Sequence, residues 1–506
     1  MKTPKGTLKG DSLNNLFSSS IDYHLSVFYK KIAEYEPAFL FENWKKIVRC
    51  IDEIINIPFE LHQEEVLSLF NYYKDDGSFK SNKIKEILAS SLTDEFNSDV
   101  SARFMEFSSM CSILKLELDK KDYFSKFGDQ LNFNNTENRI HYFQSRRLYF
   151  VTVLFLIPKV AVGQKKTNFS ELLNDFFEIL DVCLVNVTTS FQKKMINNCI
   201  TGYEMTFNSV TNVGVGNFEF ETLESFYLNP QRLSLLDQLE FRKDEIKKIK
   251  PLGILKKKVF SFSELADTMN YLSSAFTKYE IKDYPLFNTL DRFFVDISSF
   301  IIDDYEIIID ASNFRRITSK NCTLILYLES SDYFENLNSI SPFQKLDNYY
   351  YSTVVLLERY AYNLLVNSLL SNRRFQINSG FVFEDMISSV LEANGFEDLG
   401  ITRIGRKEFD VVALKNADKI YNFQCKNNYY DIASVDRDSK RMISMNKRLC
   451  SYYEKALNKE KAREHLLIDK VGIKNIEHFV VSRFPVITRN PRIINFNVFE
   501  KRLKEL

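Results

Sequence analysis

The stretch EFDVVALKNADKIYNFQCK, residues 408–426, is the part of the chain from which the C-terminal architecture follows. Its first run, 408–414, begins with acids and is rich in Val, Leu and Phe, a composition typical of a strand. A short polar break at 415–418 precedes a second strand-like run at 419–426. The stretch therefore predicts a β-hairpin.

The hairpin also predicts which side chains meet. Side chains alternate along a strand, so Gln424 and Lys426 share one face and Cys425 takes the other. Residues directly opposite each other across antiparallel strands point to the same face, and pairing Asp410 with Gln424 gives the simplest register. That register centres the turn on residue 417 and leaves a loop of three residues, a common length. The spacing predicts an acid, an amide and a lysine on one surface.

A helix is predicted ahead of the hairpin, at 379–396. Its apolar residues recur at helical spacing and form one stripe. Gly395 stands where a helix end favours a left-handed residue, and Phe396 can fold back onto the stripe. Glu384 lies beside the buried edge of the expected first turn, so its carboxylate can be aimed at a neighbouring sheet.

The remaining C-terminal segments are expected to complete a mixed sheet. A short first strand is predicted at 399–404, a long helix at 436–465, further strands at 478–482 and 493–498, and a closing helix at 499–506. The order is one helix, three strands, a second helix and two strands, which indicates an α/β region.

The residues gathered by the hairpin suit phosphodiester hydrolysis. This reaction needs a water in line with the phosphorus and positive charge at the phosphate oxygens, which Mg²⁺ supplies through oxygen ligands and retained waters. Asp410 would provide an anionic ligand, and the Gln424 side-chain oxygen and the Cys425 backbone carbonyl would provide neutral ones. Lys426 would orient the attacking water or stabilise the developing charge.

These residues, in this order, resemble the PD-(D/E)xK nuclease superfamily, which has the restriction-endonuclease-like fold. The QxK element at 424–426 is most similar to the Mrr-type branch, where QxK is a known form. The resemblance covers residues 379–506. It implies that Asp410 binds the metal, that Lys426 is catalytic and that Glu384 assists, with Mg²⁺ as the cofactor and Mn²⁺ as a substitute.

The sequence departs from that family at two positions. Phe409, not Pro, precedes Asp410, although this position is commonly relaxed in the family. The neutral Gln424 removes one negative charge, so metal binding is expected to depend on Asp410, with Glu384 or Glu408 as further candidate ligands. A solvated hairpin with an edge lysine is the alternative interpretation, as is a nuclease fold that has lost activity.

Basic residues are expected to bind the nucleic acid. From residue 376 onward the chain has 23 Lys and Arg against 18 Asp and Glu, a mild excess that favours a polyanionic substrate. The predicted helix at 436–465 holds the ones expected near phosphates, which are Arg437, Lys440, Arg441, Lys447 and Arg448. A solvated helix face explains them equally well. A second basic segment, 242–258, could also contact phosphates, but a solvated charged face is its commoner explanation.

The N-terminal 375 residues contain no motif of known chemistry: the sequence has no P-loop, no GxGxxG after a strand and no HExxH. The chain is expected to divide into a flexible tail, a mainly helical domain, an α+β region of unknown role and the nuclease-like domain, at residues 1–12, 13–210, 211–375 and 376–506. The fold class is therefore multidomain: a mainly α N-terminal region with some β, followed by a C-terminal α/β domain.

Within the α+β region, strands are predicted at 305–310 and 322–329, and a helix at 352–371. Loop residues at 211–217 suggest one boundary. The main boundary is expected at 372–378.

Composition is that of a soluble globular protein, with 45% apolar and 26% charged residues and no net charge. Seven cysteines, with no CxxC pair, indicate reduced thiols in a cytoplasmic protein and no zinc site. The N-terminus lacks an apolar signal core. The longest apolar run, 148–157, is too short for a membrane span, so we expect a buried core segment and no membrane partner.

The most direct interpretation is a Mg²⁺-dependent endonuclease acting on double-stranded DNA, in restriction or antiviral defence, with the N-terminal region as a recognition or sensing module. This setting rests on analogy with the family. A DNA repair or recombination nuclease is one alternative, and a catalytically inactive nucleic-acid-binding scaffold is another. The N-terminal region is also where a homo-oligomer contact or a partner protein is expected.

Overall fold

The computed structural model describes residues 4–55, 136–208, 214–218, 262–279, 285–302, 305–415, 418–428, 440–483 and 485–506, with a few isolated residues between 90 and 102. Within these ranges the protein is mainly helical, with one mixed sheet and three antiparallel ones. The expected mainly helical layout with a smaller share of sheet is confirmed. Among the residues described, no helix has the length and apolar character of a membrane span.

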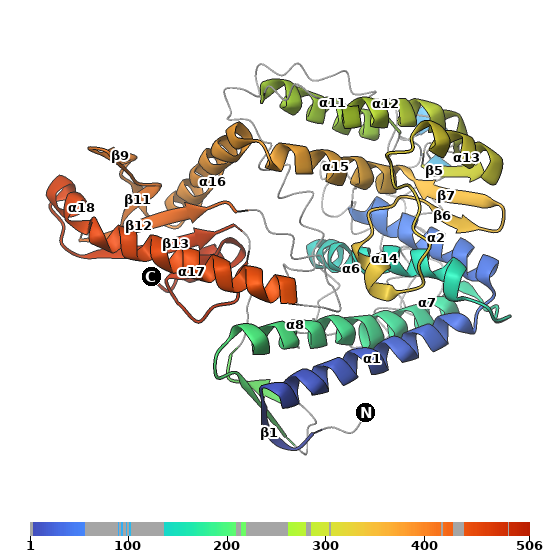
Figure 1. Cartoon of the computed structure of the whole chain (residues 1–506), viewed down its shortest axis with the longest axis horizontal. Helices are drawn as coiled ribbons and strands as arrows, with labels where there is room; N and C mark the ends of the chain where they lie inside the picture. Colours follow the sequence, from blue (N-terminus) through green and yellow to red (C-terminus); the bar gives the residue numbers. More distant parts are fainter. Residues whose placement is uncertain are drawn as a thin grey trace.

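The N-terminal part of the molecule is a layer of packed helices (Figure 1). It consists of α1 (Asp11–Ala33), α2 (Pro37–Ile55), α6 (Thr136–Val160), α7 (Phe169–Phe177), a π-helix (Glu178–Leu184) and α8 (Val185–Cys199). Helix α1 packs along α8, and α2 along α6. Apolar residues at three- and four-residue intervals, from Leu13 to Ile32, give α1 its buried face. The described residues of the region expected to be mainly helical are mostly in helices, and the apolar run 148–157 is buried inside α6.

A small antiparallel sheet lies next to the N-terminal end of α1. Its strands are β1 (Gly6–Lys9), β2 (Glu204–Phe207) and β3 (Gly214–Gly216), in that order. The loop predicted at 211–217 is therefore wrong for its middle residues. Its glycines permit a close approach, because a Cβ on Gly214 would stand 2.5 Å from the Phe207 ring.

The central part of the molecule packs helices against a four-stranded antiparallel sheet of order β4-β5-β7-β6. The helices are α11 (Phe262–Lys278), α12 (Pro285–Ile297), α13 (Ala311–Lys320), α14 (Tyr333–Asn338) and α15 (Val354–Leu370). The strands are β4 (Ile301–Ile302), β5 (Glu306–Asp310), β6 (Gln344–Leu346) and β7 (Tyr349–Thr353). Strand β5 and helix α15 confirm the elements predicted at 305–310 and 352–371.

The strand predicted at 322–329 is wrong. This stretch is fully described, and its one ladder contact is an isolated bridge from Tyr327 to Phe343. Leu324 and Leu326 are buried, which explains why the pattern is strand-like. Alternating apolar residues indicate that one side of a segment is buried. A strand also needs a neighbouring strand to pair with, which the pattern does not specify.

The C-terminal part contains the predicted hairpin within a five-stranded sheet of order β14-β13-β12-β11-β8. Its elements are α16 (Arg373–Ala393), β8 (Glu397–Asp398), β9 (Arg403–Ile404), β10 (Lys407–Glu408), β11 (Val411–Lys415), β12 (Lys419–Lys426), α17 (Lys440–Ala462), α18 (Glu464–Val471), β13 (Ile476–Ser482), β14 (Ile493–Asn495) and α19 (Phe499–Leu503). Strands β8, β11 and β12 run antiparallel, whereas β12, β13 and β14 run parallel. The sheet is mixed, as expected.

Helix α16 begins earlier than predicted. The Asn372 side chain caps it by accepting a hydrogen bond from the Phe375 N–H at 3.0 Å, and the chain is helical from Arg373. The boundary expected at 372–378 thus lies in helix, and Glu384 lies in the middle of α16 instead of in its first turn. The predicted left-handed helix end at Gly395 is confirmed by its φ of 80°.

Three further segments differ from their predictions in extent. The run expected as a strand at 399–404 is a strand only at 403–404, and the chain turns at Gly400, which has a positive φ. The run expected at 408–414 is divided between β10, which ends at Glu408, and β11, which begins at Val411. Strands β9 and β10 form a separate two-stranded hairpin instead. The strand expected at 493–498 gives way to a 3₁₀ turn after Asn495.

The sheet is covered on both faces. Helices α16 and α19 pack on the face that carries Val411 and Phe423, whereas α18 covers the opposite face around Val412. Helix α17 shares one hydrophobic core with the N-terminal helices through residues that include Leu449 and Tyr453, and it packs directly on α8. Figure 1 shows α17, in red, extending from the sheet toward α8. The C-terminal sheet and the N-terminal helix layer are therefore joined by α17.

Candidate functional site

The hairpin has the register that the sequence predicts. Strand β11 pairs with β12 from Val411 opposite Phe423 to Lys415 opposite Lys419. One step beyond Val411, the same register sets Asp410 opposite Gln424. The spacing argument for the hairpin is confirmed.

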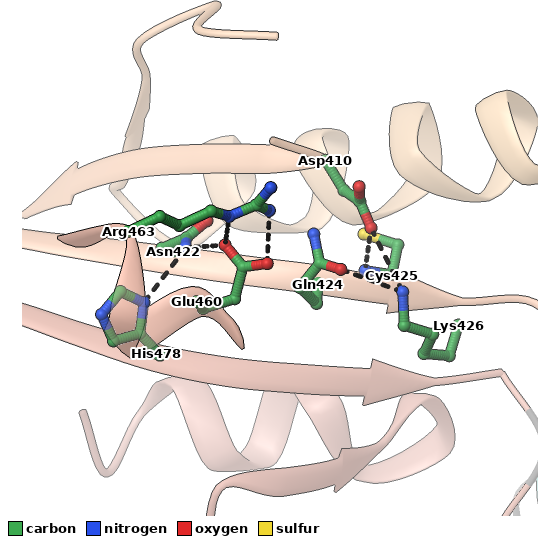
Figure 2. A network of polar contacts seen from close by, with 8 residues as sticks. All are labelled: Asp410, Asn422, Gln424, Cys425, Lys426, Glu460, Arg463 and His478. Atoms are coloured by element: carbon green, nitrogen blue, oxygen red, sulfur yellow. Dashed lines mark hydrogen bonds and ion pairs between the residues drawn. The ribbon is translucent and has the colours of Figure 1, made fainter. Parts of the chain in front are cut away.

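Four residues at this end of the hairpin are in direct contact (Figure 2). The Cys425 backbone N–H donates to Asp410 Oδ2 at 2.7 Å, and the Lys426 ammonium lies 3.8 Å from the same oxygen. Lys426 Nζ also donates to Gln424 Oε1 at 3.0 Å. The structure thus brings together the acid, the amide and the lysine that the sequence singles out.

The environment of Asp410 makes its ionisation costly. Burial raises the pKa of its carboxyl above the ordinary value, and the charge of Glu460 on α17 adds to the rise. Lys426, the Cys425 N–H and the Gln424 side chain oppose this effect because they stabilise the ionised form. The net direction of the pKa is upward, so the carboxylate would gain from a further positive charge.

Cys425 contributes through its backbone. Burial raises the pKa of its thiol well above the usual range, and the negative charges of Asp410 and Glu384 reinforce the rise. The thiol is therefore a poor nucleophile. The N–H and C=O of a strand residue point to the same side, so the Cys425 carbonyl lies on the strand edge where its N–H meets Asp410.

Glu384 and Asp410 line the same pocket, with a volume of about 510 Å³. Besides these two, its walls include Phe381, Asp385, Ser388, Asp398, Arg403, Glu408 and Phe409. Glu384 enters from α16, which packs on the Phe423 face of the sheet, whereas Gln424 and Lys426 project from the other face. Glu384 and the QxK pair therefore approach Asp410 from opposite sides.

Glu408 lies on β10, at the foot of the β9–β10 hairpin. It forms an ion pair with Arg403, and its side chain is 72% exposed. The Asp410 side chain, by contrast, is 20% exposed. A carboxylate that is solvated and already paired is a weaker candidate for a metal ligand than the largely covered Asp410.

The donor set fits a hard cation that keeps most of its water. The described residues contain no group of three or more His, Cys, Asp or Glu side chains able to hold a metal ion. The oxygen donors at the hairpin are one carboxylate from Asp410, one amide oxygen from Gln424 and one backbone carbonyl from Cys425. Mg²⁺ is often held by one or two carboxylates, waters and substrate phosphates, so these donors suit it and do not suit zinc.

The basic residues of α17 are only partly placed by the structure. Lys440, Arg441, Lys447 and Arg448 are exposed on the half of α17 that extends toward α8. Lys447 lines a second pocket together with residues of β1 and α8. Arg437 and the segment 242–258 lie outside the described residues.

Sequence reasoning missed a buried polar network beside the site. Glu460 of α17 is fully buried and accepts hydrogen bonds from Arg463 and from Asn422 of β12. Asn422 also contacts His478 Nδ1 at 3.1 Å, and His478 Nε2 lies 2.9 Å from Glu464. The available signal was a polar Asn between the aromatic residues Tyr421 and Phe423 in the middle of the strand.

No family model, no curated protein and no solved structure matches this chain. The contacts at the end of the hairpin are the most specific chemical feature of the C-terminal sheet.

Proposed function

We propose that the protein is a Mg²⁺-dependent endonuclease that hydrolyses double-stranded DNA, with an active site of the PD-(D/E)xK type in its Mrr-like QxK form. The observation that supports this most strongly is the direct contact of Asp410, Gln424 and Lys426 at the end of one hairpin. The order of helix, antiparallel strands, helix and parallel strands around the hairpin is in keeping with that fold.

Each residue has a distinct role in this proposal. Asp410 binds Mg²⁺ through its carboxylate, and the Gln424 oxygen and the Cys425 carbonyl complete the protein's share of the ligands. When bound, Mg²⁺ neutralises charge on the phosphate oxygens. Lys426 orients the attacking water and stabilises the developing negative charge. Glu384 assists from the pocket that it shares with Asp410.

The wider role is an extension of the same proposal. We place the nuclease in the cytoplasm, in restriction or antiviral defence, with the N-terminal helices and the central region as the recognition or sensing module. Repair or recombination is the alternative setting for the same chemistry.

One observation favours a second candidate, an inactive nucleic-acid-binding scaffold. Within the described residues no cluster of three potential ligand side chains could hold a metal. A scaffold of this kind would bind DNA and leave it intact.

A cleavage assay separates the two candidates. Plasmid and linear DNA would be incubated with the full chain and Mg²⁺, with and without a chelator. We expect cleavage by the wild type, and its loss in Asp410→Ala and Lys426→Ala with DNA binding largely kept. The matched controls are Asp469→Ala and Lys470→Ala, exposed residues of α18, which should cleave like wild type. Cleavage by a folded Asp410→Ala protein would overturn the assignment, and DNA binding without cleavage would favour the scaffold.

A further inference from the structure

A buried ion pair lies on the same face of β12 as Gln424. Glu460, whose side chain is fully buried, accepts hydrogen bonds from Arg463 Nε at 2.8 Å and from a second guanidinium nitrogen. The same carboxylate accepts from Asn422 Nδ2 at 2.9 Å. Figure 2 shows this network beside the contacts of Asp410 and Lys426. Two nitrogens on one carboxylate hold the plane of the Arg463 guanidinium in a single orientation.

The Arg463 guanidinium faces the aromatic ring of Phe409, the residue that precedes Asp410 in the chain. The Arg463 guanidinium carbon lies 4.4 Å from the centroid of the Phe409 ring, within the range of a cation–π contact. Phe409 is 2% exposed, and its N–H donates to the Thr402 carbonyl at 3.0 Å. Asp410 is the next residue in the chain. Arg463 thus contacts one side of the Phe409 ring, and Thr402 holds the Phe409 backbone N–H.

Asp410 needs such support from its neighbour. It lies just before the first residue of β11, so no ladder pair of its own fixes its backbone. Its carboxylate nevertheless accepts a hydrogen bond from the Cys425 N–H at 2.7 Å. Side chains that act on a metal or catalytic group through another residue commonly tune it by fixing its orientation.

We propose that Arg463 is a positioning residue: held by Glu460, it fixes the Phe409 ring and thereby the orientation of the Asp410 carboxylate. This role rests on the proposed function of Asp410. It gives α17 and the start of α18 a direct part in shaping the site. Arg463 itself touches neither the substrate nor the metal.

The substitution Arg463→Lys tests this role. Lysine keeps the positive charge that the buried Glu460 requires but lacks the planar face that lies on Phe409. We expect kcat for DNA cleavage to fall by about 10- to 100-fold, with KM and DNA affinity unchanged. The matched control is Arg492→Lys. Arg492 lies 5.0 Å from the Phe479 ring and pairs with Glu477 at 3.3 Å, but Phe479 precedes no site residue.

A second readout does not depend on catalysis. The exchange of the Cys425 amide hydrogen reports whether the Asp410 carboxylate is in place to accept it. In Arg463→Lys we expect this amide to exchange faster relative to the amides that bond within the β12–β13 ladder, as it should in an Asp410→Ala control. A purely structural role for Arg463 would instead change all ladder amides together.

The outcomes separate the two claims. Normal exchange at Cys425 together with normal kcat in Arg463→Lys would overturn the positioning role. A wild type that cleaves no DNA would overturn the proposed nuclease, while amide exchange would still decide whether Arg463 positions Asp410. If Arg463→Lys fails to fold, Phe409→Leu removes the ring and keeps the Glu460–Arg463 pair, and it should show the same selective exchange at Cys425.

Discussion

At the scale of single residues, two opposing effects act on the pKa of Asp410, the largely buried acid of the site. Burial raises the pKa of Asp410, and Lys426 lowers it. Gln424 is 6% exposed and accepts a hydrogen bond from Lys426. In the proposed function it would serve as a metal ligand without adding charge. The site should therefore bind Mg²⁺ weakly until a DNA phosphate adds negative oxygens.

The substitution Gln424→Glu should strengthen Mg²⁺ binding in the DNA-free protein, because it adds an anionic ligand of nearly the same shape. Gln424→Ala should lose a ligand and most of the cleavage activity. Calorimetric Mg²⁺ titration would measure both, with Gln376→Glu on the exposed surface of α16 as a control for the added charge. Equal Mg²⁺ affinity of the wild type and the Gln424→Glu variant would show that residue 424 does not contact the metal. The metal ligands would then have to come from Glu384, Glu408 and Asp410.

The raised pKa of Asp410 predicts a pH-dependent effect on stability. A carboxyl whose pKa is higher in the folded protein than in the unfolded chain binds its proton more tightly when folded. Asp410 therefore contributes to the stability of the folded protein at low pH, and this contribution is lost as pH rises through its folded-state pKa. In the presence of a chelator, Asp410→Asn should raise the melting temperature at pH 7, and the gain should shrink as pH falls toward 3.8. A lower melting temperature at pH 7, with Asp469→Asn unchanged, would contradict this account.

At the scale of elements, α17 has three roles along its length. Its C-terminal end supplies Glu460 next to β12, and its buried side joins the core of the N-terminal helices. Its N-terminal half extends beyond the sheet and exposes Lys440 and Arg441.

Reversing the charge of Lys440 and Arg441 together should weaken DNA binding for all sequences alike. If both contact phosphates, the slope of log K against log salt should flatten by up to about 1.8, from roughly 0.9 per contact. The control is Lys459→Glu with Lys461→Glu, exposed at the other end of α17. Binding measured by fluorescence anisotropy over a range of salt would decide. An unchanged slope would move the DNA path away from α17.

At the scale of the whole molecule, the C-terminal sheet is not packed as an independent unit. Met442, Leu449, Tyr453 and Leu457 of α17 belong to the same hydrophobic core as α1, α2, α6 and α8. A recognition or sensing region in the N-terminal half would therefore be in contact with the helix that supplies Glu460.

A fragment that begins at Asn372 should consequently be less stable than the full chain. It would expose the apolar side of α17, which the N-terminal helices cover. We expect it to bind a hydrophobic dye, to self-associate and to melt at a lower temperature than the sheet in the full chain. A monomeric fragment that unfolds cooperatively at the temperature of the full chain would contradict this dependence.

Much of the hairpin was determined by the sequence alone. The limits of β12, the pairing of Asp410 with Gln424 and the helix end at Gly395 all follow from short-range rules. Strand alternation, loop length and the conformational freedom of glycine act within a few residues, so a local pattern is sufficient to express them.

Only the tertiary structure decided which elements cover one another. The segment 322–329 has a strand pattern but no strand beside it, and α16 begins six residues before the predicted Ser379 because Asn372 caps it. The burial of Glu460 near the end of α17 and of Arg463 just before α18, and the contact of Arg463 with Phe409, depend on α17 packing back onto β12. Such contacts join residues that are far apart in the chain. Local periodicity indicates which side of an element is apolar, but it does not specify which other element packs on that side.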